Sequence, residues 1–199
     1  MPLPYYIATT LNDHTSSSGQ PSVRLRAPEP EDLDLLYTIE NDPSLWDVTD
    51  NPQPLSRYAL RQYIANAPQT LTACGEMRLV IETAESGRAI GLLDLVNYNH
   101  ADRRAEVCIA LLKARRGQGY GLAALHAAEA YARQWLHLRL LYAQVAADRN
   151  AAARHLFAKA GYTAVATLPH WHRHQEDFEN ITIYQKIIDI PLCRTAKNT

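Results

Sequence analysis

Alternating and periodic hydrophobic positions divide most of the chain into strands and helices. Apolar residues at the helical spacing of Leu122, Leu125 and Ala128 predict a long helix after residue 121. Similar spacing, with acidic or capping residues at the start, predicts three further helices over residues 28–41, 56–65 and 150–160. Short alternating or apolar runs predict strands over residues 23–26, 77–83, 90–97, 104–112, 139–145, 162–168 and 181–188. This order of elements predicts an α/β (α+β) domain with a mixed central sheet.

The two ends of the chain lie outside this pattern. Residues 1–21 include Ser16, Ser17, Ser18 and Gly19, a polar composition typical of a flexible segment. We therefore expect a flexible N-terminal extension over residues 1–21, one domain over residues 22–190 and a C-terminal tail over residues 191–199.

Composition excludes several classes of partner. The 199 residues hold 20 Lys and Arg against 21 Asp and Glu, so no global basic field favours nucleic acid. No apolar run approaches the roughly 20 residues of a membrane span, and the N-terminus lacks the pattern of a signal peptide. Three widely spaced cysteines form neither a disulfide framework nor a zinc pattern. We expect a cytoplasmic protein without nucleic-acid or membrane partners.

The segment Arg116-Gly-Gln-Gly-Tyr-Gly121 lies between a predicted strand and a predicted helix. Glycines there let the backbone approach a ligand closely, and free amides at the helix start favour an anion. A following Lys-Ser/Thr pair is absent, which excludes an NTPase phosphate loop, and the glycine spacing excludes the dinucleotide fingerprint. The segment therefore indicates a diphosphate cradle, with an unliganded glycine-rich turn as the alternative.

Two motifs carry a resemblance to a known family. Arg116-x-x-Gly119-x-Gly121 resembles the acetyl-CoA signature of the GNAT N-acetyltransferases, and residues 150–162 resemble the second signature of that family. Residues 88–106 are loosely similar to the spermidine/spermine acetyltransferase branch. The resemblance implies a single GNAT-type domain with a mostly antiparallel sheet, acetyl-CoA as co-substrate and no metal.

The resemblance also implies which residues contact the cofactor. A bulged strand would pair its backbone with the pantetheine arm, the glycine segment would surround the pyrophosphate, and the second signature would border the pantetheine and adenosine end. The residues so assigned are Ala110, Leu111 and Leu112; Arg116, Gly117, Gln118, Gly119, Tyr120 and Gly121; and Asn150 and Phe157.

Two carboxylates lie on otherwise apolar strand faces, where an unpaired charge is costly. Asp94 shares its face with Ile90 and Leu92, and Glu106 shares its face with Cys108. Amine acetylation needs a base, so both are candidate catalytic residues. We expect a hairpin centred near residue 100 to set them opposite each other, which would couple their titration. The alternative is a structural ion pair for each carboxylate, with Arg78, Arg103 or Arg104 as the partner.

The sequence differs from the family at the residue that protonates the departing thiolate. Many GNAT enzymes use a tyrosine in the second signature, but that position here is Phe157, which has no hydroxyl. Tyr184 is the candidate substitute, with water as an alternative and Tyr120 a weaker one. Simple packing of Tyr184 in the sheet is the structural alternative. A thiol leaves readily near neutral pH, so we expect a slow but real enzyme.

Two aspartates, three histidines and one cysteine are further candidate functional residues. Asp47 and Asp50 could attract a cationic amine, with surface solvation as the alternative. His170, His172 and His174 share one face of an extended strand, which raises a metal-binding hypothesis; a polar hairpin arm is the alternative. We interpret Cys108 as a small apolar residue.

These observations predict an enzyme that transfers acetyl directly to a primary amine. The acceptor would be a small polyamine-like molecule or a protein N-terminus, and an amino sugar also fits the charge argument. A homodimer is the assembly that the resemblance suggests. The alternative is a GNAT-fold module that binds acyl-CoA without turnover.

Overall fold

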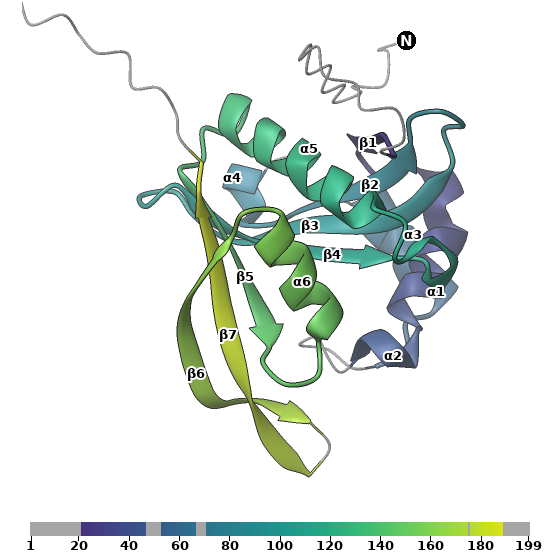
Figure 1. Cartoon of the computed structure of the whole chain (residues 1–199). Helices are drawn as coiled ribbons and strands as arrows, with labels where there is room; N and C mark the ends of the chain where they lie inside the picture. The colour runs from purple at the N-terminus through teal and green to yellow at the C-terminus, as the bar shows by residue number, and fades with distance from the viewer. Residues whose placement is uncertain (1–20, 47–52, 67–70, 175, 189–199) are drawn as a thin grey trace, which may run out of the picture.

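The computed structural model describes residues 21–46, 53–66, 71–174 and 176–188 (Figure 1). Their central feature is a seven-stranded sheet in the order β1-β2-β3-β4-β5-β7-β6, in which only the β4–β5 pair is parallel. The strands are β1 Val23–Arg26, β2 Met77–Thr83, β3 Ala89–Asn99, β4 Arg104–Leu111, β5 Leu140–Ala146, β6 Thr163–His174 and β7 Asp177–Ile187. The predicted mixed, mostly antiparallel sheet is confirmed.

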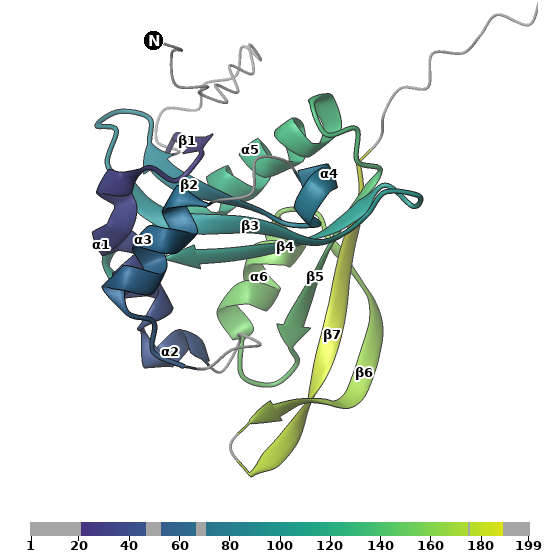
Figure 2. The same ribbon diagram turned by 180° about the vertical axis from the view of Figure 1, so that it is seen from behind.

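Helices cover both faces of the sheet. Figure 1 shows α5 (Tyr120–Gln134) and α6 (Ala151–Lys159) on one face. Figure 2 shows α1 (Leu33–Glu40), α2 (Pro43–Trp46) and α3 (Arg57–Ala65) on the other. The sequence pattern did not predict the two single-turn helices α2 and α4 (Leu71–Cys74), because four residues are too few to show a helical period. Two 3₁₀ helices, η1 (Pro30–Asp32) and η2 (Lys113–Arg115), complete the elements.

Alternation along the central strands supplies both cores. Ile81 and Leu93 pack with Leu125 and Ala128 of α5, whereas Val80 and Leu92 pack with α1 and α3. Because successive strand residues face opposite sides, the continuous apolar runs in β2 and β3 fill two layers at once. No helix among the described residues has both the length and the apolarity that crossing a membrane requires.

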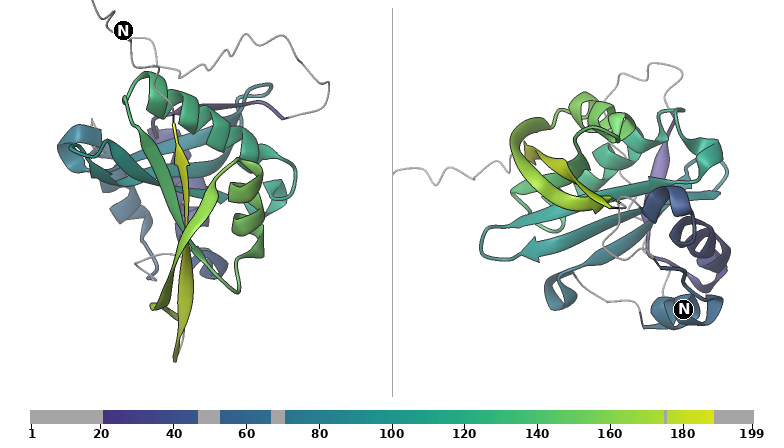
Figure 3. Two further views of the ribbon diagram at one scale, coloured as in Figure 1. Left: turned by 60° about the vertical axis from the view of Figure 1, so that its left-hand side comes forward. Right: turned by 90° about the horizontal axis from the view of Figure 1, so that it is seen from below.

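The β4 and β5 strands separate early. Only residues Arg104–Glu106 pair with Leu140–Tyr142, after which β5 continues its pairing with β7 on its other side. Beyond Glu106, no described strand pairs with the β5-facing edge of β4. The β6–β7 hairpin extends away from the body of the domain (Figure 3). The parting of β4 from β5 therefore opens the sheet at its centre.

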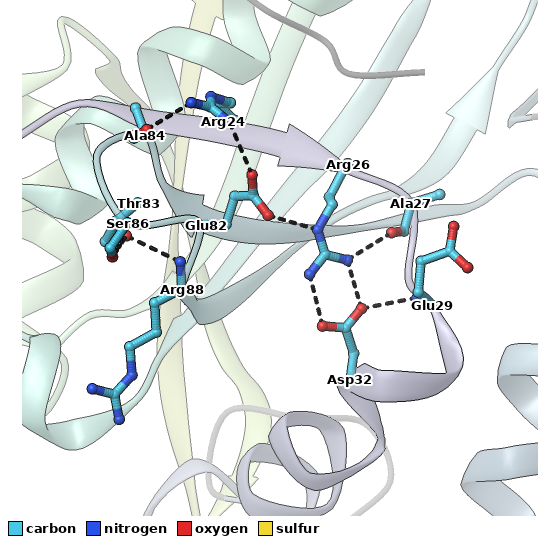
Figure 4. Close-up of polar contacts among 10 residues, drawn as sticks. All are labelled: Arg24, Arg26, Ala27, Glu29, Asp32, Glu82, Thr83, Ala84, Ser86 and Arg88. Atoms are coloured by element: carbon cyan, nitrogen blue, oxygen red, sulfur yellow. Dashed lines mark hydrogen bonds and ion pairs between the residues drawn. The ribbon is translucent and has the colours of Figure 1, made fainter. Parts of the chain in front are cut away.

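A charged cluster fixes the start of the helical layer on the sheet edge (Figure 4). Arg26 of β1 donates from Nη1 and Nη2 to Asp32 of η1 at 2.6 and 2.8 Å, and from Nε to Glu82 of β2 at 2.8 Å. Asp32 Oδ2 also accepts from the backbone N–H of Glu29 at 2.8 Å. These bonds attach the entry to α1 to the edge strand β1 and its neighbour β2, and α1 carries Glu40 into the site described next.

Candidate active site

The predicted diphosphate cradle forms a tight turn between β4 and α5. Gly117 and Gly119 have φ values of 74° and 86°, in the left-handed region where a Cβ would be strained. Gly119 is also the N-cap of the 15-residue helix α5, whose first amides have no partner within the helix. The turn therefore presents backbone N–H groups at the positive end of a helix dipole.

A cleft of about 590 Å³ opens beside this turn, with β4 on one side and β5 and α6 on the other. Arg116, Arg149 and Lys159 line it, and none of the described lining residues is acidic. Such a cationic cleft next to a helix N-terminus suits an anionic ligand. The full lining comprises Ser44, Leu45, Ile109, Ala110, Leu111, Arg116, Gly117, Gly119, Gly121, Leu122, Ala146, Arg149, Asn150, Ala152, Ala153, His155, Leu156 and Lys159.

The structure brings most of the predicted cofactor residues to this cleft. Those that line it are Ala110, Leu111, Arg116, Gly117, Gly119, Gly121 and Asn150, whereas Leu112, Gln118, Tyr120 and Phe157 do not. Arg149 and Lys159 are cleft residues that the sequence analysis missed. Lys159 lies inside the second signature and Arg149 directly before it, so positive charge in and beside that motif was the signal that could have identified them.

Arg116 connects the turn to the helical layer. Its Nε donates to the carbonyl of Leu111 at 2.9 Å, and its Nη2 donates to Asp42 at 3.4 Å. Hydrogen bonds from Ser44 hold the pKa of Asp42 below its usual range, and the charge of Arg116 adds to that effect. Asp42 directly precedes α2, so the cradle and α2 are attached to each other.

A second, smaller cavity of about 140 Å³ lies between the sheet and helices α1 and α2. Three charged side chains line it: Glu40 from α1, Arg78 from β2 and Asp94 from β3. The apolar walls come from Ile39, Leu45, Trp46, Leu92, Ile109 and Ala110, together with Cys108. Leu45, Ile109 and Ala110 also line the larger cleft, so the two cavities meet at β4.

Arg78 holds both carboxylates of the smaller cavity. Its Nε and Nη2 donate to Asp94 at 2.8 and 2.7 Å, and its Nη1 donates to Glu40 at 2.5 Å. Its guanidinium also lies over the ring of Tyr63 at 5.3 Å. Burial alone would lower the pKa of Arg78, but the hydrogen bond and charge of Asp94 and the charge of Glu40 outweigh burial and raise it. The structural alternative for Asp94, an ion pair with Arg78, is present.

The register of the β3–β4 hairpin differs from the expected one. Asp94 pairs with Cys108, and Glu106 pairs with Val96, so the expectation that the two carboxylates lie opposite each other is wrong. The chain turns over residues 100–103 rather than around residue 100, and Asn97, with a φ of 52°, begins an irregularity in the pairing. The two carboxylates share one face of the sheet, but Glu106 lies two residues along β4 from Cys108, the residue opposite Asp94.

Glu106 lies where β4 and β5 part. Its side chain is buried, and its Oε2 accepts from Asn97 at 2.9 Å and from Gln144 at 3.1 Å. Tyr142 is its partner in the β4–β5 pairing, and burial, followed by the charge of Glu106, raises the pKa of that phenol. Two neutral amide donors therefore hold this carboxylate, in contrast to the guanidinium that holds Asp94.

Tyr184 and Phe157 lie together behind the cleft. Phe157 is 3% exposed, its ring stacks on Tyr184 at 6.2 Å between centroids, and it meets Tyr162 edge-on at 5.1 Å. Neither Phe157 nor Tyr184 lines either cavity. The described contacts of Tyr184 are those of a packing residue, and its role as a proton donor stays a prediction.

The remaining candidates lie elsewhere. His170, His172 and His174 are on the extended hairpin, where His174 contacts Arg149. Across residues 21–46, 53–66, 71–174 and 176–188, no three His, Cys, Asp or Glu side chains are grouped to hold a metal. Asp47 and Asp50 lie outside the described residues.

Comparison with known proteins identifies the class to which this fold and site belong. Residues 22–163 match the family model of the acetyltransferase (GNAT) domain. Because this match spans more than half of the 199 residues, the chain belongs to the GNAT acetyltransferase family. The predicted GNAT membership and the predicted N-acetyltransferase activity class are confirmed.

Individual relatives narrow the comparison. The chain is 30% identical over 149 residues to spermidine N(1)-acetyltransferase of Escherichia coli K12, covering 75% of this chain and 77% of that protein. It is 27% identical over 138 residues to the Vibrio cholerae enzyme of the same name, covering 69% and 77%. The crystal structure of Vibrio cholerae spermidine N-acetyltransferase with CoA and spermine superposes with a TM-score of 0.73 at 24% identity, covering 84% of this chain and 96% of that chain. That last likeness supports the fold assignment.

Proposed function

We propose that this chain transfers acetyl from acetyl-CoA to a primary amine of a small polycationic molecule. The observation that carries the proposal is the meeting of a cationic cleft and a smaller, net acidic cavity at Ile109 and Ala110. A thioester in the cleft and an amine in the cavity would face each other across these two residues. The names of the relatives, spermidine N-acetyltransferases, support a polyamine as the acceptor.

The cleft has the features that CoA requires. The Gly117–Gly119 turn and the start of α5 would hold the diphosphate. Lys159 would add positive charge, as would Arg116 and Arg149, which are paired with Asp42 and Glu179. The free edge of β4 beyond Glu106 can pair with an amide-bearing arm in the manner of an added strand. Acetyl-CoA supplies an activated acetyl group as a thioester. In this placement, a backbone N–H group of Ile109 or Ala110 would polarise the thioester carbonyl.

Of the two predicted bases, the surroundings favour Glu106 as the one that takes the proton of the amine. Asp94 is held by two nitrogens of Arg78, so each of its two oxygens already accepts a hydrogen bond from a guanidinium. Glu106 is held by neutral groups. It does not line the smaller cavity, so its contact with the amine would pass through water. Asp94 would then position the substrate through its charge.

Direct transfer needs few further groups. The amine nitrogen attacks the thioester carbon, the carbon–sulfur bond breaks, and the thiolate takes up a proton. With Phe157 lacking a hydroxyl, water or Tyr184 would supply that proton. Phe157→Tyr is expected to raise kcat tenfold or more if the site lacks an acid, worth about 1.4 kcal/mol of barrier. If Tyr184→Phe instead lowers kcat tenfold while Phe157→Tyr changes nothing, Tyr184 is the donor.

The wider setting of the enzyme remains a prediction. A small amine is the expected partner, and a cytoplasmic location and a homodimer are the expectations from sequence. One structure of the Vibrio cholerae relative, at 25% identity and a TM-score of 0.68, is described as dodecameric. Light scattering of the purified chain measures its own assembly.

The test is an amine panel assayed with acetyl-CoA. We expect free thiol release in step with N-acetylated product for spermidine, spermine and 1,4-diaminobutane, and a slower rate for a peptide with a free N-terminus. CoA at 100 times its dissociation constant should stabilise the fold by about 2.7 kcal/mol. Stabilisation by CoA without thiol release from any amine would instead show a non-catalytic acyl-CoA-binding module. No stabilisation at millimolar CoA would contradict the cofactor assignment.

A further inference from the structure

The smaller cavity is less negative than its two carboxylates suggest. Arg78 donates three hydrogen bonds, two to Asp94 and one to Glu40, so the three side chains together carry a net charge of −1. An amine with several positive charges therefore finds one uncompensated negative charge in this cavity. Something else has to contribute if the cavity is to prefer a polycation strongly to a simple amine.

Trp46 lies at the right place to contribute. It is the last residue of α2 and lines the cavity together with Glu40. Its Nε1–H donates to the backbone carbonyl of Glu40 at 2.9 Å, which fixes the indole against the end of α1. The face of an indole attracts cations more strongly than any other aromatic side chain. The cavity thus has an aromatic wall beside its charged group.

The size of the cavity fixes how much of the substrate it can hold. A volume of about 140 Å³ is close to that of an engineered protein cavity that binds benzene, so about six non-hydrogen atoms fit. That is one amine with a chain of four or five methylene groups. Ile39, Leu45 and Leu92 supply apolar contacts for such a chain.

Acetyl transfer separates the two ends of such a substrate. The reacting nitrogen has to be neutral and close to Ile109 and Ala110, where the cavities meet. Any charged nitrogen has to be bound elsewhere in the cavity. Glu40 and Trp46 come from α1 and α2, whereas Ile109 and Ala110 come from β4, so the cation-binding groups and the backbone at the reacting position come from different elements. Leu45 of α2 borders both cavities and connects the two.

The geometry points to Trp46 as a specificity-determining residue that selects amines carrying a second positive charge. The indole would lie against the distal ammonium of a diamine, adding a cation–π contact to the charge of the Glu40–Arg78–Asp94 group. This inference rests on the proposed function, because it assigns a substrate preference to the same site. It makes the aromatic ring, in addition to the carboxylates, responsible for discrimination.

The experiment compares two substrates of equal length on variants of Trp46. 1,4-Diaminobutane carries a second ammonium, and 1-aminopentane replaces it with a methyl group. Trp46→Leu should raise KM for the diamine about tenfold, with kcat little changed, and leave kcat/KM for 1-aminopentane within twofold. Trp46→Phe keeps a weaker aromatic face, so its KM for the diamine should lie between the values of the wild type and Trp46→Leu. The matched control is Trp135→Leu, at a tryptophan 66% exposed at the end of α5, and it should change neither substrate.

Each outcome decides the inference. If Trp46→Leu lowers kcat/KM equally for both substrates, or for neither, Trp46 is only an apolar wall and the inference is wrong. If Trp46→Leu fails to fold, Trp46→Phe provides the test: a diamine KM equal to that of the wild type, or equal losses for both substrates, would refute it. Failure of the wild-type enzyme to acetylate any amine would instead refute the proposed function itself. Measuring the wild type first therefore separates the two failures.

Discussion

Two arginines in this chain each hold two carboxylates from other elements, and their surroundings differ. Arg26 joins Asp32 and Glu82 at the edge of the sheet, and Arg78 joins Asp94 and Glu40 beside the centre of the sheet. Each arginine grips its aspartate with two nitrogens, at 2.6 and 2.8 Å for Asp32 and at 2.7 and 2.8 Å for Asp94. The bonding chemistry of the two groups is therefore the same.

Exposure distinguishes them. The side chains of Asp32 and Glu82 are 4% and 6% exposed, whereas those of Asp94 and Glu40 are 20% and 21% exposed and line a cavity. A buried group of this kind can only hold the fold together, because no ligand reaches it. The same group at a cavity wall supplies charge to a ligand. Access, rather than the presence of paired charges, marks the functional cluster.

The largest effect is expected from Asp32→Asn. The substitution leaves Arg26 with one carboxylate in a buried site and weakens the bonds that hold η1 on β1. Removing one partner of a buried ion pair costs about 3 kcal/mol or more of the free energy of unfolding. Urea unfolding measures this loss, while kcat/KM per folded molecule should be unchanged. A loss below about 1 kcal/mol would show that this cluster does not hold the sheet edge.

Asp94→Asn makes the same substitution in the group of Glu40, Arg78 and Asp94 that lines the smaller cavity. It removes the net negative charge of the Glu40–Arg78–Asp94 group, so a cationic amine should bind less well. We expect kcat/KM for 1,4-diaminobutane to fall about 30-fold, equivalent to about 2 kcal/mol, while KM for acetyl-CoA stays within twofold. Steady-state kinetics with each substrate varied in turn measures both values. Equal changes in both KM values would argue against separate cavities.

The glycine turn allows a matched test of the cofactor cleft. Gly117 and Gly87 have φ values of 74° and 65°, and a Cβ at either position would meet nothing within 4 Å. Alanine at either position should therefore cost a similar amount of stability, about 1 kcal/mol. Only Gly117→Ala should weaken CoA binding, by about tenfold, because only that turn lies at the cleft. Calorimetric titration with CoA compares the two variants, and equal affinities would remove the turn from the site.

The smallest effect concerns pH. The pKa of Asp42 is lowered in the folded chain, chiefly by hydrogen bonds from Ser44 and further by the charge of Arg116. Its contribution to stability is present above its unfolded pKa, about 3.9, and is lost as pH falls through the lower folded value. The wild type should therefore exceed Asp42→Asn in stability by a few tenths of a kcal/mol at pH 7, since the site is exposed, and by less near pH 3. Melting temperatures at both pH values measure this, and a difference that does not change with pH would contradict it.

Sequence reasoning reached the cofactor half of the site because that half is built from contiguous motifs. Arg116 through Gly121 and the helix after Asn150 act largely through backbone groups and fixed spacing, which a single segment can reveal. The acceptor half combines Glu40, Arg78 and Asp94 from three elements, and strand register brings them together. Asp94 was found because a carboxylate on an apolar face is costly. Glu40 gave no such signal, since it lies at the end of an ordinary helix, and Trp46 gave none because α2 is too short to show a helical period.

The register error has a physical cause. Period-two alternation predicts which residues share a face of a strand, and it placed Asp94 and Glu106 on the same face. It does not show where a turn begins or where a bulge adds a residue. Here the turn lies further along the chain than expected, with Asn99 opposite Arg104. The irregularity at Asn97, which has a left-handed φ, moves the pairing back by one residue, so that Asp94 lies opposite Cys108.

The most direct test of the cavity around Arg78 as the amine site is the rate at which the Asp32→Asn and Asp94→Asn variants acetylate 1,4-diaminobutane. Each rate is normalised to the folded fraction of its variant. The Asp32 variant should keep the wild-type rate despite the larger loss of stability. The Asp94 variant should lose about 30-fold in kcat/KM with the smaller loss of stability. If both variants keep the wild-type rate, or if the Asp32 variant loses as much as the Asp94 variant, the cavity around Arg78 is not the amine site.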